Sequence, residues 1–488
     1  MVPVLLIVIP LVSGLLGFLI KQEKNAKVWS LLTSIITMVV SILGIAVLHK
    51  PEYLQADVAW LPDLGSRFSL TMDGMSKMLC LLTGLAYPGI FIATWNSTYK
   101  NGYQFYALML LMQTGLMGVF VASDALLFYF FWELALIPAY FLCSIWGGER
   151  RVAVTFKFFI YTFVGSLLML VAIIWVYFHT PDHSFAMSSF YKVNLPGSTQ
   201  GWLFWLFFLA FAIKIPLFPF HTWQPDTYEQ SPTAVTMVLS GIMVKMGVFG
   251  ILRWLAPVVP VGLWGYGDPA ASMCVIGMIY GSIVAMQQDD LKRFVAYSSI
   301  AHMGLMGLAI FVTSSIGIQG VMIQMFAHGI NIIGLWIVVE LIERQFHTRK
   351  MSELGGLAQK APSLAIMLVV VSLANVALPL TNAFIGEFMM FNGVFGSKAS
   401  NYHYIFMVVG GLSIILSAVY TLNMLQKVLF GNTSPLTANA LDLKINEKFV
   451  LAVLLIGIVV MGVYPKPMIE ATRHAVDAIY SKMFVKLP

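Results

Sequence analysis

Cysteine is scarce in this chain. The only three, Cys80, Cys143 and Cys274, lie far apart among 488 residues, with no CxxC pair and no metal-ligand spacing. This pattern argues against a disulfide framework, iron–sulfur clusters and zinc sites alike. The sequence also lacks a nucleotide-binding loop, a flavin motif and a credible nucleophilic triad, so a self-contained enzyme is the least favoured class.

Charge is equally sparse. Charged residues make up 10% of the chain and hydrophobic residues 59%, a composition that predicts a polytopic helical membrane protein rather than a water-soluble one. The formal net charge of +6 is spread over short loops, so it indicates membrane topology and not nucleic-acid binding. Residues 1–20 lack a basic leader and a small-residue cleavage site, which favours a retained first span over a signal peptide.

Apolar runs long enough to cross a bilayer follow one another along the whole chain. We count fourteen, near residues 2–20, 29–48, 75–96, 104–122, 124–146, 153–178, 202–220, 233–257, 270–287, 291–311, 317–343, 363–395, 404–430 and 447–465. Lys and Arg are concentrated in the odd-numbered loops of this count, as at Arg150, Arg151 and Lys292. The positive-inside tendency therefore predicts odd loops in the cytoplasm and both termini on the outer, periplasmic side.

Proline interrupts two of these spans, at Pro216 and Pro219 in the seventh and at Pro379 in the twelfth. In lipid, a carbonyl freed by proline is tolerated only where protein or water satisfies it. Spans four to eight and nine to thirteen each have the broken helix in fourth place, which is typical of inverted five-helix repeats in a transporter. The predicted division is residues 1–100 with helices one to three, 101–260 with the first repeat, 261–432 with the second, and 433–488 with the last span and an amphipathic C-terminal segment.

Four charged residues fall roughly midway along apolar spans: Glu133, Lys214, Lys245 and Glu387. A mid-span lysine cannot easily reach the interface, and an unpaired carboxylate there is costly, so each group needs a partner. Structural ion pairs are one interpretation. A protonatable relay is the other, because burial and a nearby opposite charge push a lysine pKa in opposite directions and make it adjustable.

Polar side chains also line up on two neighbouring spans. Gln324, His328 and Asn331 have the spacing of one helix face, and so do Ser298 and His302. A lone buried histidine is often only a satisfied core residue. Two histidines on adjacent spans, between buried lysines and a glutamate, favour stepwise proton transfer.

Two further acidic sites have a favoured structural interpretation. Asp124 is expected to cap its helix through the free amides of the first turn. Residues 221–235, which contain His221, Asp226 and Glu229, are expected to form a capped, well-packed turn, with a proton entrance as the alternative. The stretch from Pro465 is predicted to be an amphipathic surface helix on the outer face.

Five segments together carry a resemblance: FFWELALIPAYFL, FAIKIPLFPFHTWQPDTYEQSPTAV, GIMVKMGVFGILR, LKRFVAYSSIAHMG and QMFAHG. They resemble the antiporter-like proton-channel subunits of respiratory complex I over nearly the whole chain. The glutamate in NAFIGEF, where the L and N types carry lysine, resembles the M type. One departure is visible, because the family's LPGT form places glycine before threonine and this chain has Leu380 there.

The resemblance implies an all-α membrane protein of fourteen helices with two inverted repeats. It implies a proton relay in which Glu133 partners Lys214, Lys245 is central, His302 and His328 bridge, and Glu387 is terminal. It also implies a translocase subunit in a bacterial inner membrane, with L-type and N-type neighbours and membrane lipids as partners. No cofactor or metal is expected in this chain, since NADH, FMN, iron–sulfur clusters and quinone would belong to partner subunits.

Two alternatives remain open at the level of sequence. A subunit of a multisubunit sodium/proton antiporter or of a membrane-bound hydrogenase would use the same fold and the same buried lysines. A non-pumping membrane subunit would keep the charges only as structural pairs.

Overall fold

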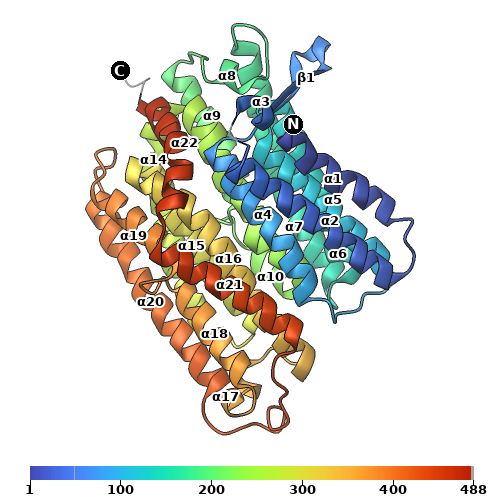
Figure 1. Cartoon of the computed structure of the whole chain (residues 1–488). Helices are drawn as coiled ribbons and strands as arrows, with labels where there is room; N and C mark the ends of the chain where they lie inside the picture. Colours follow the sequence, from blue (N-terminus) through green and yellow to red (C-terminus); the bar gives the residue numbers. More distant parts are fainter. Residues whose placement is uncertain (49, 485–488) are drawn as a thin grey trace.

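Apolar helices dominate the computed structural model, which describes residues 1–48 and 50–484 (Figure 1). Within those residues, eleven helical stretches are long and apolar enough to cross a membrane. They are α2 (Glu23–Ala46), α4 (Gly74–Ala93), α5 (Gly102–Val121), α6 (Ala125–Trp146), α7 (Arg151–His179), Thr233–Val258, α14 (Pro260–Met286), α15 (Leu291–Phe311), α16 (Ser315–Phe346), α20 (His403–Leu429) and α21 (Ile445–Val463). The chain is therefore a multi-pass membrane protein, as predicted.

The three remaining predicted spans are present as shorter helices. They are α1 (Val2–Gly17), α9 (Gly197–Lys214) and the pair α18 (Pro362–Asn375) and α19 (Asn382–Phe395). The count of fourteen membrane crossings, the inverted relation of the two blocks and the domain boundaries stay predictions.

Short elements connect the long helices. They are α3 (Pro51–Leu54), η1 (Pro62–Leu64), α8 (Met187–Phe190), α10 (Trp223–Gln230), η4 (Met351–Glu353) and α17 (Leu357–Lys360). A two-stranded antiparallel hairpin, β1 (Gln55–Leu61) and β2 (Ser66–Thr71), was not predicted. Its strands are far shorter than a membrane span, so a search for long apolar runs passes over them.

The last helix, α22 (Lys466–Phe484), is amphipathic as expected. Its buried residues recur at helical spacing, at Met468, Thr472, Val476, Ile479 and Met483. This face packs on α4 and α16, so α22 covers the helices that lie at the centre of the bundle.

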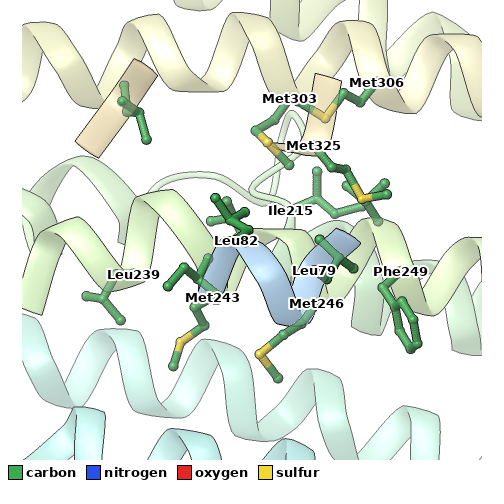
Figure 2. Close-up of a cluster of buried hydrophobic side chains, with 14 of the residues drawn as sticks. Leu79, Leu82, Ile215, Leu239, Met243, Met246, Phe249, Met303, Met306 and Met325 are labelled. Atoms are coloured by element: carbon green, nitrogen blue, oxygen red, sulfur yellow. The ribbon is translucent and has the colours of Figure 1, made fainter. Parts of the chain in front are cut away.

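The most buried helices are the stretch Thr233–Val258, α15 and α16. Sulfur-rich packing surrounds them, and Figure 2 shows part of it. The labelled side chains are Leu79 and Leu82 of α4, Ile215, Leu239, Met243, Met246 and Phe249 of the first block, and Met303, Met306 and Met325 of α15 and α16. Methionine adapts its shape at low cost, so this core can follow small movements of the polar groups beside it.

Both predicted helix breaks are present. The helix α9 ends at Lys214 before Pro216, and α18 ends at Asn375 before Pro379. A side-chain N–H satisfies a carbonyl at each break: Trp223 Nε1 donates to the Ile213 oxygen at 2.9 Å, and Asn331 Nδ2 to the Ala374 oxygen at 3.0 Å. The breaks are therefore built into protein contacts, as apolar surroundings require.

The stretch Thr233–Val258 is not a uniform α-helix. It comprises α11 (Thr233–Val238), the π-helical η2 (Leu239–Met243), α12 (Val244–Gly250), the π-helical η3 (Ile251–Leu255) and α13 (Ala256–Val258). Wide π turns are frequent at functional sites. Lys245 is the second residue after the first of them, and its Nζ donates a hydrogen bond to the Ser240 carbonyl within that π turn at 2.8 Å.

The second break contains a strained residue. Leu380, which stands where the family pattern has glycine, adopts a φ of +75°. A left-handed conformation costs a residue with a Cβ about 1–2 kcal/mol. The departure noted in the sequence therefore has a physical consequence at the bend that precedes Glu387.

Replacing Leu380 by glycine is expected to raise the free energy of unfolding by about 1 kcal/mol, because glycine adopts this φ without strain. Leu378→Gly is the matched control, since Leu378 is also exposed but has no positive φ. It should lose about 1 kcal/mol. Thermal unfolding of the detergent-solubilised protein measures both, and a Leu380→Gly variant less stable than the parent would contradict the strain.

Candidate functional site

A line of polar side chains crosses the apolar core on four helices. Lys245 Nζ lies 2.8 Å from His328 Nδ1, and His302 Nδ1 lies 3.0 Å from Glu387 Oε1. The rings of His328 and His302 are 5.7 Å apart between centroids. The structure thus brings together four of the six predicted relay residues, from α12, α16, α15 and α19.

All four side chains are almost completely buried, with at most 6% of any residue exposed. When Lys245 is charged, its ammonium can only donate hydrogen bonds, so His328 then accepts at Nδ1 and carries its own proton at Nε2. That Nε2 has no hydrogen-bond partner. A small ring movement or one intervening water would connect it to the next histidine.

Two of the three polar residues predicted on one face of α16 contact this line, and the third contacts the helix break beside it. His328 contacts Lys245, and Gln324 Nε2 donates to Glu387 Oε1 at 3.2 Å. Asn331 holds the end of α18 through the Ala374 carbonyl. Each of the three polar side chains on this face of α16 therefore has a polar partner on a neighbouring helix.

A side branch leaves the line at His302. Asn375 Nδ2 lies 3.3 Å from His302 Nε2 and 3.2 Å from Ser298 Oγ, and Ser298 Oγ is 3.1 Å from the hydroxyl of Tyr420. Sequence reasoning found Ser298 but missed Asn375 and Tyr420. A polar residue four positions before Pro379 was the available signal for Asn375, whereas nothing marked Tyr420 among the aromatic residues of its helix.

The other two predicted residues lie apart from this line. Lys214 Nζ has no hydrogen-bond partner and lies over aromatic faces, 5.5 Å from the centre of Trp132 and 5.9 Å from that of Phe158. Glu133 lines an apolar lateral groove of about 310 Å³. Glu133 and Lys214 form no hydrogen bond or ion pair with each other at contact distance, although the two groups lie near enough to interact electrostatically. Their partnership stays a prediction of the resemblance.

Cation–π contact is the compensation that Lys214 has instead of a carboxylate. Such contacts contribute about 2 kcal/mol when desolvated, well below the cost of burying an unpaired ammonium. The lysine is thus poised to accept a better partner, and Glu133 lies on the helix that also supplies Trp132.

Asp124 caps a helix, as predicted. Its carboxylate accepts from the amides of Leu126 and Leu127 at 3.0 Å, and also from Ser66 Oγ and the Arg67 amide. All of these contacts stabilise the start of α6 and its junction with the hairpin, so Asp124 has a structural role.

The turn around α10 is also held structurally, by an ion-pair cluster. Asp226 pairs with Lys157 at 2.9 Å and Arg293 at 3.2 Å, and Glu229 pairs with Arg293 at 2.8 Å. Burial alone would raise the pKa of Asp226, but hydrogen bonds and charge from Lys157 and Arg293 outweigh it and hold the pKa of this carboxyl below its usual value.

Metal binding finds no support in the part of the chain that the structure describes. There, no group of three or more His, Cys, Asp or Glu side chains is arranged to hold a metal ion. The chemistry that the buried line itself offers is proton exchange between nitrogen and oxygen atoms at hydrogen-bond distance.

Residues 122–417 match the family model described as "NADH:quinone oxidoreductase/Mrp antiporter, TM". This match covers more than half of the chain and includes all six predicted relay residues. The chain belongs to this family.

Relatives within the family align over almost the whole length. The chain is 34% identical to NADH-quinone oxidoreductase subunit M of Rickettsia bellii, covering 98% of each sequence. It is 33% identical to F(420)H(2) dehydrogenase subunit M of Methanosarcina mazei, covering 99% of each. Among solved structures, a chain of respiratory complex I from Thermus thermophilus superposes with a TM-score of 0.91 and 28% identity, over 99% of this chain and 100% of that one.

Removing one cation from the α10 cluster tests its structural role. Arg293→Gln is expected to lower the free energy of unfolding by about 1 kcal/mol near pH 6, since it loses contacts to Asp226 and Glu229. The pKa of Asp226 is lowered by folding, so this stabilisation is present above the unfolded pKa of about 4 and is lost as the pH falls further.

The difference between parent and Arg293→Gln should therefore shrink as the pH falls through about 4. Thermal unfolding midpoints between pH 6 and pH 3 measure it. Arg151→Gln is the control, because Arg151 is half-buried and donates to the Gly148 carbonyl rather than to a carboxylate. A difference that is the same at every pH would show that Asp226 does not respond to Arg293.

Proposed function

We propose that this chain is a proton-translocating membrane-arm subunit of an NADH-quinone oxidoreductase, complex I. The observation that carries the proposal is the buried line from Lys245 through His328 and His302 to Glu387. Burying these groups in a membrane protein is costly, and closely spaced titratable groups in apolar surroundings typically mark a proton relay.

The order of transfer is inferred from two hydrogen bonds and from the approach of the two histidine rings between them. The Lys245 ammonium gives a proton to His328 Nδ1, and His328 releases its Nε2 proton toward His302. His302 then passes the proton on Nδ1 to Glu387 Oε1, with which it is already in contact. Each step breaks one N–H bond and forms one N–H or O–H bond, so no electron changes place.

Glu133 and Lys214 control the loading of this line in the proposed mechanism. When Glu133 approaches Lys214, the ion pair holds the positive charge there. When Glu133 withdraws, the unpaired ammonium gives its proton to a water molecule, which passes a proton on to the neutral amine of Lys245, so each N–H or O–H bond that breaks is replaced by another. The energy comes from quinone reduction in partner subunits, through conformational and electrostatic change.

Several partners follow from the proposal. The neighbours are L-type and N-type antiporter-like subunits, and NADH, FMN, iron–sulfur clusters and quinone lie in other subunits. The location is a bacterial inner membrane with both termini on the periplasmic side. Support for the assignment to complex I comes from a relative that aligns over 98% of this chain and is named NADH-quinone oxidoreductase subunit M.

A neutral side chain of similar length at Lys245 separates transport from structure. Lys245→Met is expected to lower NADH-driven proton pumping at least tenfold, because methionine fills the space but carries no proton. The measurement is acidification of inverted vesicles, with assembly and NADH oxidation by an artificial acceptor checked first.

Lys427→Met on α20 is the matched control, since Lys427 is exposed and outside the line. It should pump at the parental rate. Parental pumping in Lys245→Met would overturn the relay and favour a structural subunit. Pumping that requires sodium, without quinone reduction, would instead favour the antiporter alternative.

A further inference from the structure

Asn375 lies where the second broken helix meets the proton line. It is the last residue of α18, it is 4% exposed, and its Nδ2 faces both His302 Nε2 and Ser298 Oγ. No sequence motif or family resemblance assigned it a role. Its contacts nevertheless constrain the protonation of His302 more directly than any other neighbour except Glu387.

An amide nitrogen can only donate hydrogen bonds. With Asn375 Nδ2 toward it, His302 Nε2 must be an acceptor without a proton. The single proton of the neutral ring then lies on Nδ1, from which it is donated to Glu387 Oε1 at 3.0 Å. The amide orientation thus selects the neutral ring and the tautomer that faces the terminal carboxylate.

A proton arriving at His302 must bind Nε2, because Nδ1 is occupied by the bond to Glu387. The resulting imidazolium donates from both nitrogens. Its Nε2–H would face the N–H of the Asn375 amide, which is repulsive. Rotating the amide by half a turn brings Oδ1 to Nε2 and removes this conflict.

The side branch accommodates that rotation. In one state Asn375 Nδ2 donates to Ser298 Oγ; in the other, the Ser298 hydroxyl donates to Oδ1 and accepts from the Tyr420 hydroxyl. Only hydrogens and one amide move, because Ser298 lies 3.1 Å from Tyr420 and 3.2 Å from Asn375 in a buried site. The direction of the hydrogen bonds through Asn375, Ser298 and Tyr420 can therefore reverse without any helix moving.

We propose that Asn375 is a positioning residue whose amide orientation selects between neutral and charged His302 and thereby sets when the line can be loaded. The proposal rests on the proposed proton relay. The position of Asn375 couples its amide to the helix break. Asn331 donates a hydrogen bond to the adjacent Ala374 carbonyl, and residues 376–381 of the break follow Asn375 directly. A shift of the break would turn the amide.

The groups that surround His302 fix the expected pH response. Glu387 faces it from α19, His328 from α16 with Lys245 behind it on α12, and Tyr420 reaches it through Ser298 from α20. Two more helices pack on α15. The helix α10 places Asp226 and Glu229 against Arg293, more than two turns before His302, and α14 places Cys274 beside Gly307, more than one turn after it. Asn375 is the only one of the direct contacts whose polarity can reverse without titrating.

Two replacements with the same number and branching of side-chain heavy atoms as asparagine test the proposal in opposite directions. Asn375→Asp provides only acceptors and a negative charge, so it favours charged His302. Asn375→Leu provides no acceptor, so it disfavours the charged ring. The alkaline limb of the pH profile of NADH-driven pumping is expected to move up by about 1 pH unit in the first and down by about 1 unit in the second.

Gln113→Leu is the control, because Gln113 is a fully buried amide on α5 without a hydrogen-bond partner. It should leave the profile in place. Opposite shifts support the proposal, whereas unchanged profiles, or shifts in the same direction, overturn it. If the leucine variant fails to assemble, the shift in Asn375→Asp decides alone.

The Lys245→Met result distinguishes failure of the proton relay from failure of the positioning role of Asn375. If that variant stops pumping while both Asn375 variants keep the parental profile, only the positioning role fails. If Lys245→Met pumps normally, the relay fails and the role of Asn375 falls with it.

Discussion

The contact between Lys245 and His328 is the interaction on which the central arrangement depends. Neither side chain is exposed by more than 1%, and the 2.8 Å bond places an ammonium against a ring nitrogen in surroundings that offer it little else. Satisfying that ammonium requires the π turn that presents the Ser240 carbonyl. It also requires α16 to pass close by, which fixes the positions of Gln324 and Asn331 as well.

Irregular backbone and soft packing serve the same requirement. The π turns around α12 and the two broken helices place carbonyls and amides where a regular helix would hide them, and each break is closed by a side-chain donor. Methionine side chains fill the adjacent core (Figure 2). Polar groups can therefore change partners in this region without leaving cavities, which is what a repeated transfer cycle demands.

Sequence reasoning recovered the features that composition and helical spacing determine. The sequence predicted the mid-span charges, the polar face of α16, the two proline breaks and the amphipathic α22. The residues it missed depend on how distant helices pack: Asn375 and Tyr420 meet at Ser298 only because α18 and α20 converge on α15. Short strands escaped for a different reason, since β1 and β2 lie below the length of a span.

The implied pairing of Glu133 with Lys214 shows where spacing stops being informative. Lys214 is buried as predicted and lies over Trp132 and Phe158, whereas Glu133 is only half-buried and lines a groove. Contact between two side chains depends on rotamers and on a few ångströms of helix offset, neither of which periodicity determines. Sequence located the charges but not their contacts.

The link between the two histidines offers the most direct test of proton transfer. Replacing His328 by phenylalanine keeps an aromatic ring of similar size but removes both nitrogens, so Lys245 and His302 lose their only intermediate among the described residues. The quantity to measure is the number of protons pumped per NADH oxidised by the intact complex in proteoliposomes. The account predicts that this ratio falls, or that turnover falls with it, whereas parental values of both would contradict a relay through the line.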